Sequence, residues 1–259
     1  MRTIAIANHK GGVGKTTTAV NLSAGLARAG YRTLLVDVDA QAHATFWFVE
    51  EPADVEFDLQ DVISKGLPID KAVLRTRIEG LDLLPATLAL APLETELVSM
   101  TRREDRIQRA LDGLADSYDV AVLDLAPSLS LVTLAALVAA TDVIAPVSAT
   151  KLAVGGLGAF LAWTDDFWTE GLITAPLLGI LVTMVDQRTR VTREAMDALR
   201  GSGLPLRLND FTSLLIFLAA GGYLLAGRRG GAAQNQPPAT GTEALHTGSA
   251  VDASSRHGR

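Results

Sequence analysis

The chain has 259 residues, 48% of them hydrophobic, and a net charge of −6. It is long enough for one large domain with a substantial core, and its negative charge argues against a general nucleic-acid binder. Cysteine is absent, which excludes disulfides, a thiol nucleophile and a cysteine metal site, and the four histidines lack the spacing of a zinc site. Because the first ten residues, MRTIAIANHK, contain no apolar signal-peptide core, we expect a folded cytosolic domain to begin at the N-terminus.

Apolar runs typical of buried strands alternate with helical patterns along residues 1–206. The expected strands are 2–8, 32–41, 80–87, 118–128, 141–149 and 176–186. The expected helices are 15–30, 58–66, 102–116, 157–171 and 191–203. Strands that are apolar throughout and alternate with helices predict an α/β fold, with a twisted, mostly parallel sheet and helices on both faces. Ligands of such sheets bind at the carboxyl ends of the strands, where the polar residues considered next fall.

The stretch NHKGGVGKTTT, residues 8–18, joins the first expected strand to the first expected helix. Its glycines allow a tight turn whose backbone N–H groups face phosphate oxygens, and the helix N-terminus adds partial positive charge. Lys15 is placed to reach the β- and γ-phosphates of a nucleotide, and Thr16 to bind Mg²⁺. An ordinary glycine-rich turn is the alternative, but strand, loop, Gly-Lys-Thr and helix occur in the order that a phosphate-binding loop requires.

One position departs from the usual phosphate-loop pattern, G-x-x-x-x-G-K-[ST], because histidine stands at position 9 and Lys10 follows it. From spacing alone, a solvated loop lysine and a functional lysine are equally good interpretations of Lys10. The sequence KGGVGKTT resembles the deviant Walker A motif of the ParA/MinD family of P-loop ATPases, in which the early lysine is the signature residue. The resemblance implies the P-loop NTPase fold, a homodimer that forms on ATP, and a Lys10 that reaches the ATP of the other subunit and offsets phosphoryl charge as an arginine finger does. The expected nucleotide-binding residues are Lys10, Gly11, Gly12, Val13, Gly14, Lys15, Thr16 and Thr17.

The segment LLVDVDAQAHAT, residues 34–45, is similar to the ParA pattern D-x-D-P-Q-x-N-A-T. Ala40 replaces the proline and His43 the asparagine, whereas the other defined positions match. Asp37 and Asp39 lie on alternate residues of an expected strand and therefore point the same way. The resemblance assigns to Asp39 the positioning of the attacking water or a place in the Mg²⁺ shell. MinD-type proteins differ in this segment, so it favours the ParA branch.

A third stretch, YDVAVLDLAPSLSLVTLAAL at residues 118–137, resembles the Walker B region of the family. Asp124 matches the aspartate that holds Mg²⁺, usually through a water. Without this context, an aspartate at a strand end is more often a helix cap or a turn residue. The segment LDLLPATLAL, residues 81–90, also resembles the family pattern, in which it closes one side of the sheet. We expect no chemistry from it.

Arg188 lies in VTMVDQRTR, residues 182–190, which resembles a strand-to-helix turn of the family. It matches an arginine that, in several chromosomal ParA proteins, contributes to sequence-nonspecific DNA binding by the ATP dimer. Such binding would involve the phosphate backbone without base readout. The equally weighted alternative is a solvated basic helix start balanced by Glu194 and Asp197.

The resemblance covers residues 1–206, taken as the ATPase domain, and the C-terminal end is atypical. Residues 207–227 include 17 uncharged residues, 211–227, followed by two arginines. A changed reading frame is our preferred explanation. The alternatives are a variant ending whose hydrophobic helix packs on the core, and a membrane element with cytoplasmic arginines. Residues 228–259 are rich in small and polar residues, and we expect them to be disordered.

The sequence therefore predicts a cytoplasmic, nucleoid-associated ParA-type ATPase that hydrolyses ATP to ADP and phosphate with Mg²⁺. The resemblance implies that it dimerises on ATP, binds DNA non-specifically, and responds to a ParB-type partner in plasmid or chromosome partitioning. The alternatives are a membrane-associated MinD-like positioning ATPase anchored through 211–227, and a nucleotide-binding protein that does not cycle. The expected catalytic residues are Lys10, Lys15, Asp39 and Asp124, the expected metal ligands are Thr16, Asp39 and Asp124, and the expected DNA contact is Arg188.

Overall fold

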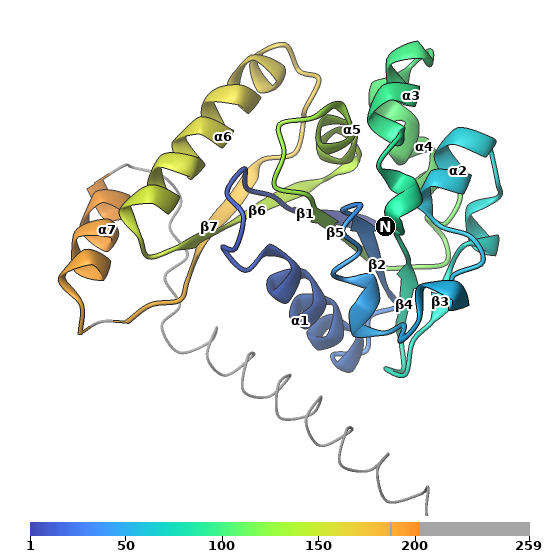
Figure 1. Cartoon of the computed structure of the whole chain (residues 1–259), viewed down its shortest axis with the longest axis horizontal. Coiled ribbons are helices and arrows are strands. Elements are labelled where there is room, and N and C mark those ends of the chain that lie inside the picture. The colour runs from blue at the N-terminus through green and yellow to red at the C-terminus, as the bar shows by residue number, and fades with distance from the viewer. Residues whose placement is uncertain (187, 202–259) are drawn as a thin grey trace, which may run out of the picture. The chain divides into compact units, whose positions relative to one another are not determined.

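A computed structural model describes residues 1–186 and 188–201 of the chain. The predictions made for 207–227 and 228–259 lie outside these residues. The described residues form a sheet with the strand order β3-β4-β2-β5-β1-β6-β7, parallel except for β3, which pairs antiparallel with β4 (Figure 1). The strands are β1 Arg2–Ile6, β2 Thr33–Val38, β3 Leu74–Arg75, β4 Leu81–Leu84, β5 Val120–Leu125, β6 Asp142–Ser148 and β7 Leu177–Thr183. The prediction of a mostly parallel α/β sheet is confirmed.

Helices cover both faces of the sheet, as predicted. Helix α1 lies on one side of the sheet in Figure 1, and α5 and α6 lie on the other, with α7 packed against α6. The α-helices are α1 Lys15–Arg28, α2 Leu59–Lys65, α3 Leu93–Ser99, α4 Arg106–Asp112, α5 Leu131–Ala139, α6 Lys151–Thr169 and α7 Arg190–Gly201. Short 3₁₀ turns are η1 Thr45–Trp47, η2 Pro52–Asp54, η3 Ile69–Lys71, η4 Leu88–Leu90 and η5 Arg103–Asp105. No helix of the described part of the chain is long and apolar enough to cross a membrane.

The central strands are buried from end to end. All six residues of β2, TLLVDV, and all six of β5, VAVLDL, are buried. Each aspartate in these otherwise apolar strands is therefore enclosed, which is costly unless the carboxylate has a partner or a function. Asp37 of β2 and Asp124 of β5 are therefore candidates for a functional role.

The strand register brings the carboxyl ends of three central strands together. Asp124 of β5 pairs in register with Ile6 of β1 on one side and with Asp37 of β2 on the other. The loop that leaves β1 therefore starts level with both buried aspartates. The sheet topology places residues from three separate sequence motifs at the carboxyl ends of the central strands, as expected for a ligand site in a parallel sheet.

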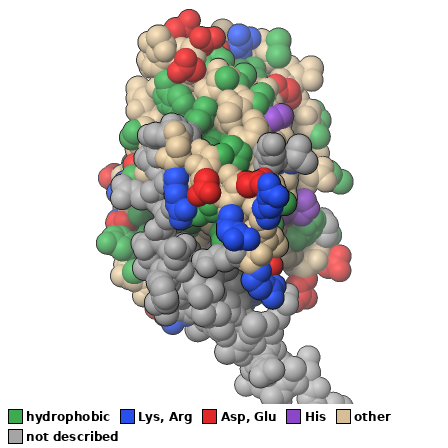
Figure 2. Space-filling model, turned by 90° about the vertical axis from the view of Figure 1, so that its left-hand side faces the viewer, with side chains coloured by type: hydrophobic (Ala, Val, Ile, Leu, Met, Phe, Trp, Pro, Cys, Tyr) green, Lys and Arg blue, Asp and Glu red, His purple; other side chains and the backbone are tan. Residues whose placement is uncertain are grey.

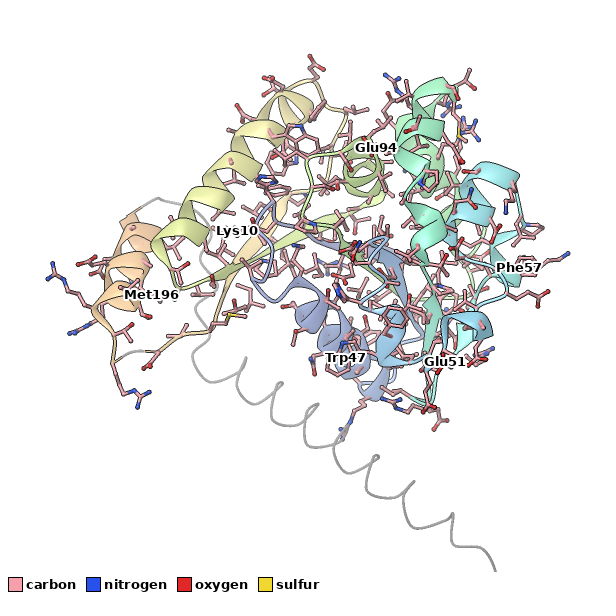
Figure 3. All side chains as sticks on the ribbon, in the orientation of Figure 1. Lys10, Trp47, Glu51, Phe57, Glu94 and Met196 are labelled. Atoms are coloured by element: carbon pink, nitrogen blue, oxygen red, sulfur yellow. The ribbon has the colours of Figure 1, made fainter. Side chains whose placement is uncertain are left out.

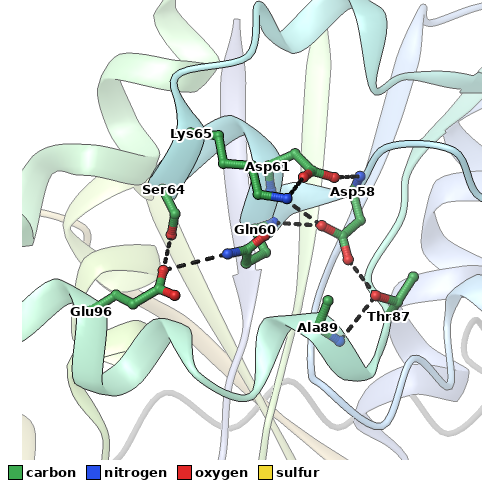
Figure 4. A network of polar contacts seen from close by, with 8 residues as sticks. All are labelled: Asp58, Gln60, Asp61, Ser64, Lys65, Thr87, Ala89 and Glu96. Atoms are coloured by element: carbon green, nitrogen blue, oxygen red, sulfur yellow. Dashed lines mark hydrogen bonds and ion pairs between the residues drawn. The ribbon is translucent and has the colours of Figure 1, made fainter.

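A network of polar contacts fixes α2 and α3 beside the end of β4 (Figure 4). Asp58 caps α2 by accepting hydrogen bonds from the backbone of Gln60 and Asp61, and it also accepts one from the Thr87 hydroxyl at 2.5 Å. Glu96 of α3 accepts a hydrogen bond from Ser64 of α2. These contacts satisfy the free N–H groups at the start of α2.

Three expected elements differ in the structure. The helix predicted over 157–171 is α6, which begins earlier, at Lys151, after Thr150 as its N-cap. The helix predicted over 102–116 is shorter and consists of η5 followed by α4, which ends at Asp112. From Gly113 to Ser117 the chain continues in turns with i→i−3 hydrogen bonds in place of the α-helix, and glycine at position 113 disfavours a further helical turn. The segment 81–90, expected to close one side of the sheet, contains β4 but does not form the sheet edge, because β3 pairs outside β4.

Candidate functional site

The glycine-rich loop between β1 and α1 uses left-handed backbone conformations. Gly14, directly before α1, has φ 89°, and Gly12 has φ 71°. Only glycine adopts such conformations at little cost, so these two positions fix the turn that brings the loop back to the start of the helix. The helix begins at Lys15, as predicted, and no side chain caps its N-terminus. Its first N–H groups and its partial positive charge remain available to an anion.

Two strands hold the loop in place. The side-chain amide of Asn8 donates to the carbonyl of Pro146 in β6 at 2.7 Å. The hydroxyl of Thr183, at the end of β7, donates to the carbonyl of Val13 at 2.8 Å. The loop is therefore anchored near both of its ends before any ligand arrives. Such preorganisation lowers the cost of binding.

Lys15 is buried inside the loop. The residue is 7% exposed, and its Nζ donates to the carbonyl of Lys10 at 3.1 Å. Burial lowers the pKa of the Lys15 ammonium, and the nearby carboxylates of Asp124 and Asp39 oppose this shift. A largely enclosed cation beside the first turn of α1 is a suitable partner for the phosphates of a nucleotide.

Asp124 is buried at the end of β5, and neither of its carboxylate oxygens has a hydrogen-bond partner among the described residues. Burial and the neighbouring charge of Asp37 raise the pKa of Asp124 to about 7, against smaller opposing effects of Thr16 and Lys15. Buried carboxylates are normally satisfied, so a pair of free oxygens here calls for a cation. Mg²⁺ prefers such oxygen donors, usually one or two carboxylates together with phosphates and water. Asp124 and Thr16 therefore fit the magnesium prediction.

Asp37 and Asp39 have different surroundings. Asp37 is fully buried and accepts hydrogen bonds from the backbone N–H and the hydroxyl of Thr45, both at 2.8 Å, and from the N–H of Asp39. Burial raises the pKa of Asp37 to about 6, and the bonds from Thr45 oppose this. Asp39 lies just beyond β2, and its Oδ1 accepts a bond from the N–H of Gln41. Asp37 therefore fixes the segment after β2, and Asp39 is the carboxylate with capacity for a ligand.

Lys10 occupies the exposed side of the loop. Its N–H donates to Oδ1 of Asn8 at 3.0 Å, and its carbonyl accepts from Lys15. The residue is exposed, and its ammonium has no ion-pair or hydrogen-bond partner in the described part of the chain. Figure 3 shows Lys10 at the loop, beside α6. The two lysines of the loop therefore face different surroundings.

Arg188 does not belong to this site. It lies between β7 and α7, its side chain is 90% exposed, and its guanidinium pairs with Asp186 at 2.9 Å. On α7, Arg190 pairs with Glu194 and Arg200 with Asp197. Figure 2 shows basic side chains interleaved with acidic ones on this side of the molecule.

The structure brings the residues of the three predicted motifs, namely the loop, Asp39 and Asp124, together at the carboxyl ends of the central strands. Arg188 lies elsewhere. Sequence reasoning did not identify the anchors Asn8 and Thr183. The Thr183 hydrogen bond joins residues 170 positions apart, so no local spacing could have indicated it.

A glycine-rich loop between the first strand and its helix, a buried lysine at the helix start and a free carboxylate at the end of a neighbouring strand define a P-loop nucleoside triphosphatase. A family model described as an AAA domain matches residues 1–172. The chain belongs to the ParA/MinD family of P-loop ATPases, in its ParA/Soj-like partitioning branch.

Two curated relatives support this assignment. The chain is 41% identical to the sporulation initiation inhibitor protein Soj of Bacillus subtilis, over 76% of this chain and 78% of that protein. It is 40% identical to the chromosome partitioning protein ParA of Myxococcus xanthus, over 77% of this chain and 71% of that one. Among solved structures, it is similar to a Mycobacterium smegmatis protein named cobyrinic acid a,c-diamide synthase, with bound ATP analogue and magnesium. The TM-score is 0.76 and the identity 34%, over 89% of this chain and 97% of that one.

Proposed function

We propose that the protein is a ParA-type ATPase that hydrolyses ATP to ADP and phosphate and serves plasmid or chromosome partitioning. The observation that carries the proposal is the pair of lysines in one loop: Lys15 is buried beside Asp124, and Lys10 is exposed. The names of the B. subtilis and M. xanthus relatives support partitioning, and the nucleotide and magnesium of the M. smegmatis structure support ATP and Mg²⁺ as ligands.

The P-loop would hold the triphosphate. The backbone of Gly11, Gly12, Val13 and Gly14 would contribute N–H donors, and Thr16 and Thr17 would add hydroxyls. Lys15 would neutralise β- and γ-phosphate charge from within the loop. Burial lowers the pKa of the Lys15 ammonium because it disfavours the charged form, so an anionic phosphate beside it would offset an existing electrostatic cost.

Thr16 and Asp124 would hold Mg²⁺, with Asp39 near its shell. When bound, the ion neutralises charge that develops on the phosphate oxygens. Asp39 would orient the attacking water, because it lies beyond the strand with one oxygen still available, whereas Asp37 is fully committed to Thr45.

Lys10 would complete the site of a second subunit. Its exposure and the lack of a described partner for its ammonium suit a cation that finds its ligand in another molecule. On this proposal ATP joins two subunits, the dimer binds DNA non-specifically with Arg188 among the contacts, and a ParB-type partner stimulates hydrolysis. The protein would then be cytoplasmic and nucleoid-associated.

The direct experiment measures phosphate release from ATP by the full chain, with and without DNA and with Mg²⁺ or EDTA. We expect Mg²⁺-dependent turnover that DNA or the partner increases. Lys15→Ala should lose ATP binding and turnover together, since the ammonium that neutralises the phosphates is gone. A full chain that releases no phosphate under any of these conditions would contradict the enzymatic proposal and leave a nucleotide-binding protein that does not cycle.

A further inference from the structure

Helix α6 contains three closely spaced glycines, Gly155, Gly156 and Gly158. Glycine disfavours a helix interior relative to alanine, so each of these positions raises the question of what the missing side chain permits. At Gly155 and Gly158 an added Cβ would meet nothing within 4 Å in the described part of the chain outside the adjoining helix backbone. At Gly156 it would lie 3.0 Å from Cβ, 3.6 Å from Cγ and 3.8 Å from Cδ of Lys10. Of these three glycines, Gly156 is the one against which another described residue packs, and that neighbour is the aliphatic part of the Lys10 side chain.

The contacted part of Lys10 cannot move freely. Its N–H is bound to Asn8 and its carbonyl to the Lys15 ammonium, so the backbone on both sides of Cα is held. Asn8 is itself attached to β6 through Pro146. The Cβ of Lys10 is therefore fixed to an anchored loop, and the closest approach is not made by the flexible end of a side chain. Figure 3 shows the residue between the loop and α6.

We propose that Gly156 is a positioning residue for Lys10. Because Gly156 has no side chain, the aliphatic part of Lys10 packs directly on α6. This contact limits the conformations of the Lys10 side chain. It thereby directs the ammonium toward its proposed position at the ATP of a second subunit. The inference rests on the proposed function of Lys10. Holding a reacting group in one geometry before the reaction is a recognised source of catalytic rate.

Gly156→Ala tests the inference with the smallest possible change. Carbon atoms in contact lie roughly 3.5–4.0 Å apart, so the new methyl group and Lys10 Cβ must separate by about 0.5 Å. We expect kcat for ATP to fall on the order of 10-fold, because misplacing a catalytic group by about 1 Å can cost about 100-fold. The affinity of the monomer for Mg-ATP should stay within about twofold, because Lys10 is proposed to contact the nucleotide of the other subunit and not the one held by its own loop.

Two matched controls lie in the same helix. Gly155→Ala and Gly158→Ala add the same methyl group where no other described residue outside the adjoining helix backbone lies within 4 Å, so both should keep wild-type kcat. Gly155→Ala and Gly158→Ala should be at least as stable to heat as the wild type, because alanine favours the helix. In Gly156→Ala the contact with Lys10 opposes this gain, so we expect thermal stability close to that of the wild type. A loss of kcat in Gly156→Ala without a loss of thermal stability separates positioning from general damage to the fold.

A double variant connects the effect to Lys10. If Gly156 acts through Lys10, Gly156→Ala should cause no further loss of the residual kcat that a Lys10→Ala background retains, measured at high protein concentration. Equal kcat in Gly156→Ala and Gly158→Ala would overturn the inference while leaving the proposed function intact, and so would additive losses in the double variant. Wild-type turnover by Lys10→Ala would instead refute the proposed role of Lys10 and, with it, any need for a positioning residue.

Discussion

Asp124 is the residue whose surroundings most clearly separate stability from function. Its carboxylate is buried, lacks hydrogen-bond partners among the described residues and stands in register with a second buried aspartate, Asp37. An ionised group in this position destabilises the protein when no cation is bound. The same negative charge on Asp124 would become favourable when Mg²⁺ binds beside it, so the burial of this carboxylate is consistent with a role in metal binding.

This argument predicts a pH-dependent gain of stability in Asp124→Asn. The pKa of Asp124 in the folded protein is raised from 3.8 to about 7, so ionisation costs stability progressively as pH rises through this window and fully above it. Asparagine removes the cost. In EDTA and without nucleotide, the melting temperature of Asp124→Asn relative to wild type should therefore increase more at pH 8 than at pH 5.

Asp119→Asn is the matched control for this experiment. Asp119 lies at the surface with its side chain 39% exposed, and its contacts with Arg32 hold its pKa below the ordinary value of 3.8, so the group is ionised in the folded protein at both pH values. Its substitution should change the melting temperature by a similar small amount at pH 5 and pH 8. An Asp124→Asn effect that is the same at both pH values would contradict the electrostatic account of the site.

At the scale of an element, the segment after β2 depends on Thr45. Its hydroxyl donates to Asp37 at 2.8 Å and accepts from the N–H of Ala86 at 3.0 Å, which connects β2 to the end of β4. Thr45→Val keeps the shape but leaves a buried carboxylate short of one donor and a buried N–H without its acceptor. We expect a loss of at least about 2 kcal/mol in the free energy of unfolding, measured by urea denaturation.

Thr45→Ser provides the comparison, because it keeps the hydroxyl and removes one methyl group. It should cost about 1 kcal/mol. The proposed positioning of water by Asp39, which lies in the same segment, should also survive in Thr45→Ser and weaken in Thr45→Val. Equal stability of the two variants would show that the hydroxyl does not hold this segment.

The elements that could be predicted from sequence are those with a strong local pattern. The central strands are continuous apolar runs, and α7 alternates exposed arginines with buried residues such as Met196 and Leu199. The two-residue strand β3 has no such pattern. Helix α5 was also not predicted, because LVTLAALVA is apolar nearly throughout and has no amphipathic period; its start depends on Ser130 and on Glu94 of α3.

The same limit applies to the candidate site. The family resemblance identified Lys10, Lys15 and Asp124 because each lies in a recognisable motif. The different environments of Asp37 and Asp39 depend on which neighbour reaches each carboxylate, and the support of Lys10 by Gly156 depends on a helix far along the chain. Contacts of this kind have no spacing signal in the sequence.

At the scale of the whole molecule, the surface formed by α7 and the turn after β7 carries both basic and acidic side chains. The arginines that would contact DNA are each close to an acidic partner: Arg188 to Asp186, and Arg190 and Arg200 to carboxylates on α7. Exposed ion pairs of this kind contribute little to stability and exchange readily. A DNA phosphate could therefore replace the carboxylate, but each contact would be weak and strongly salt-dependent.

Arg188→Glu should weaken DNA binding by the ATP-bound protein about tenfold and lower the salt slope of binding by about 1, without changing ATP affinity. The measurement is fluorescence anisotropy with duplex DNA at several salt concentrations. Arg77→Glu changes the net charge equally on an exposed residue between β3 and β4, at the opposite edge of the sheet, and should have little effect. Equal losses in both variants would reduce the effect to net charge and remove Arg188 as a contact.

The central claim is that the two lysines of one loop serve two different ATP molecules, and mixing two inactive variants tests it most directly. Lys10→Ala lacks the cation given to the partner, and Asp39→Ala lacks the carboxylate that orients water in its own site. In a mixed dimer, the Lys10→Ala subunit keeps its own Asp39 and receives Lys10 from the Asp39→Ala subunit, so one of the two sites is complete.

With random pairing at equal concentrations, half of the dimers are mixed and half of their sites are complete, so the mixture should recover about one quarter of wild-type phosphate release. Each variant alone should release almost none. The account predicts this recovery. A mixture of the two variants that dimerises on ATP and still releases no more phosphate than either variant alone would contradict it.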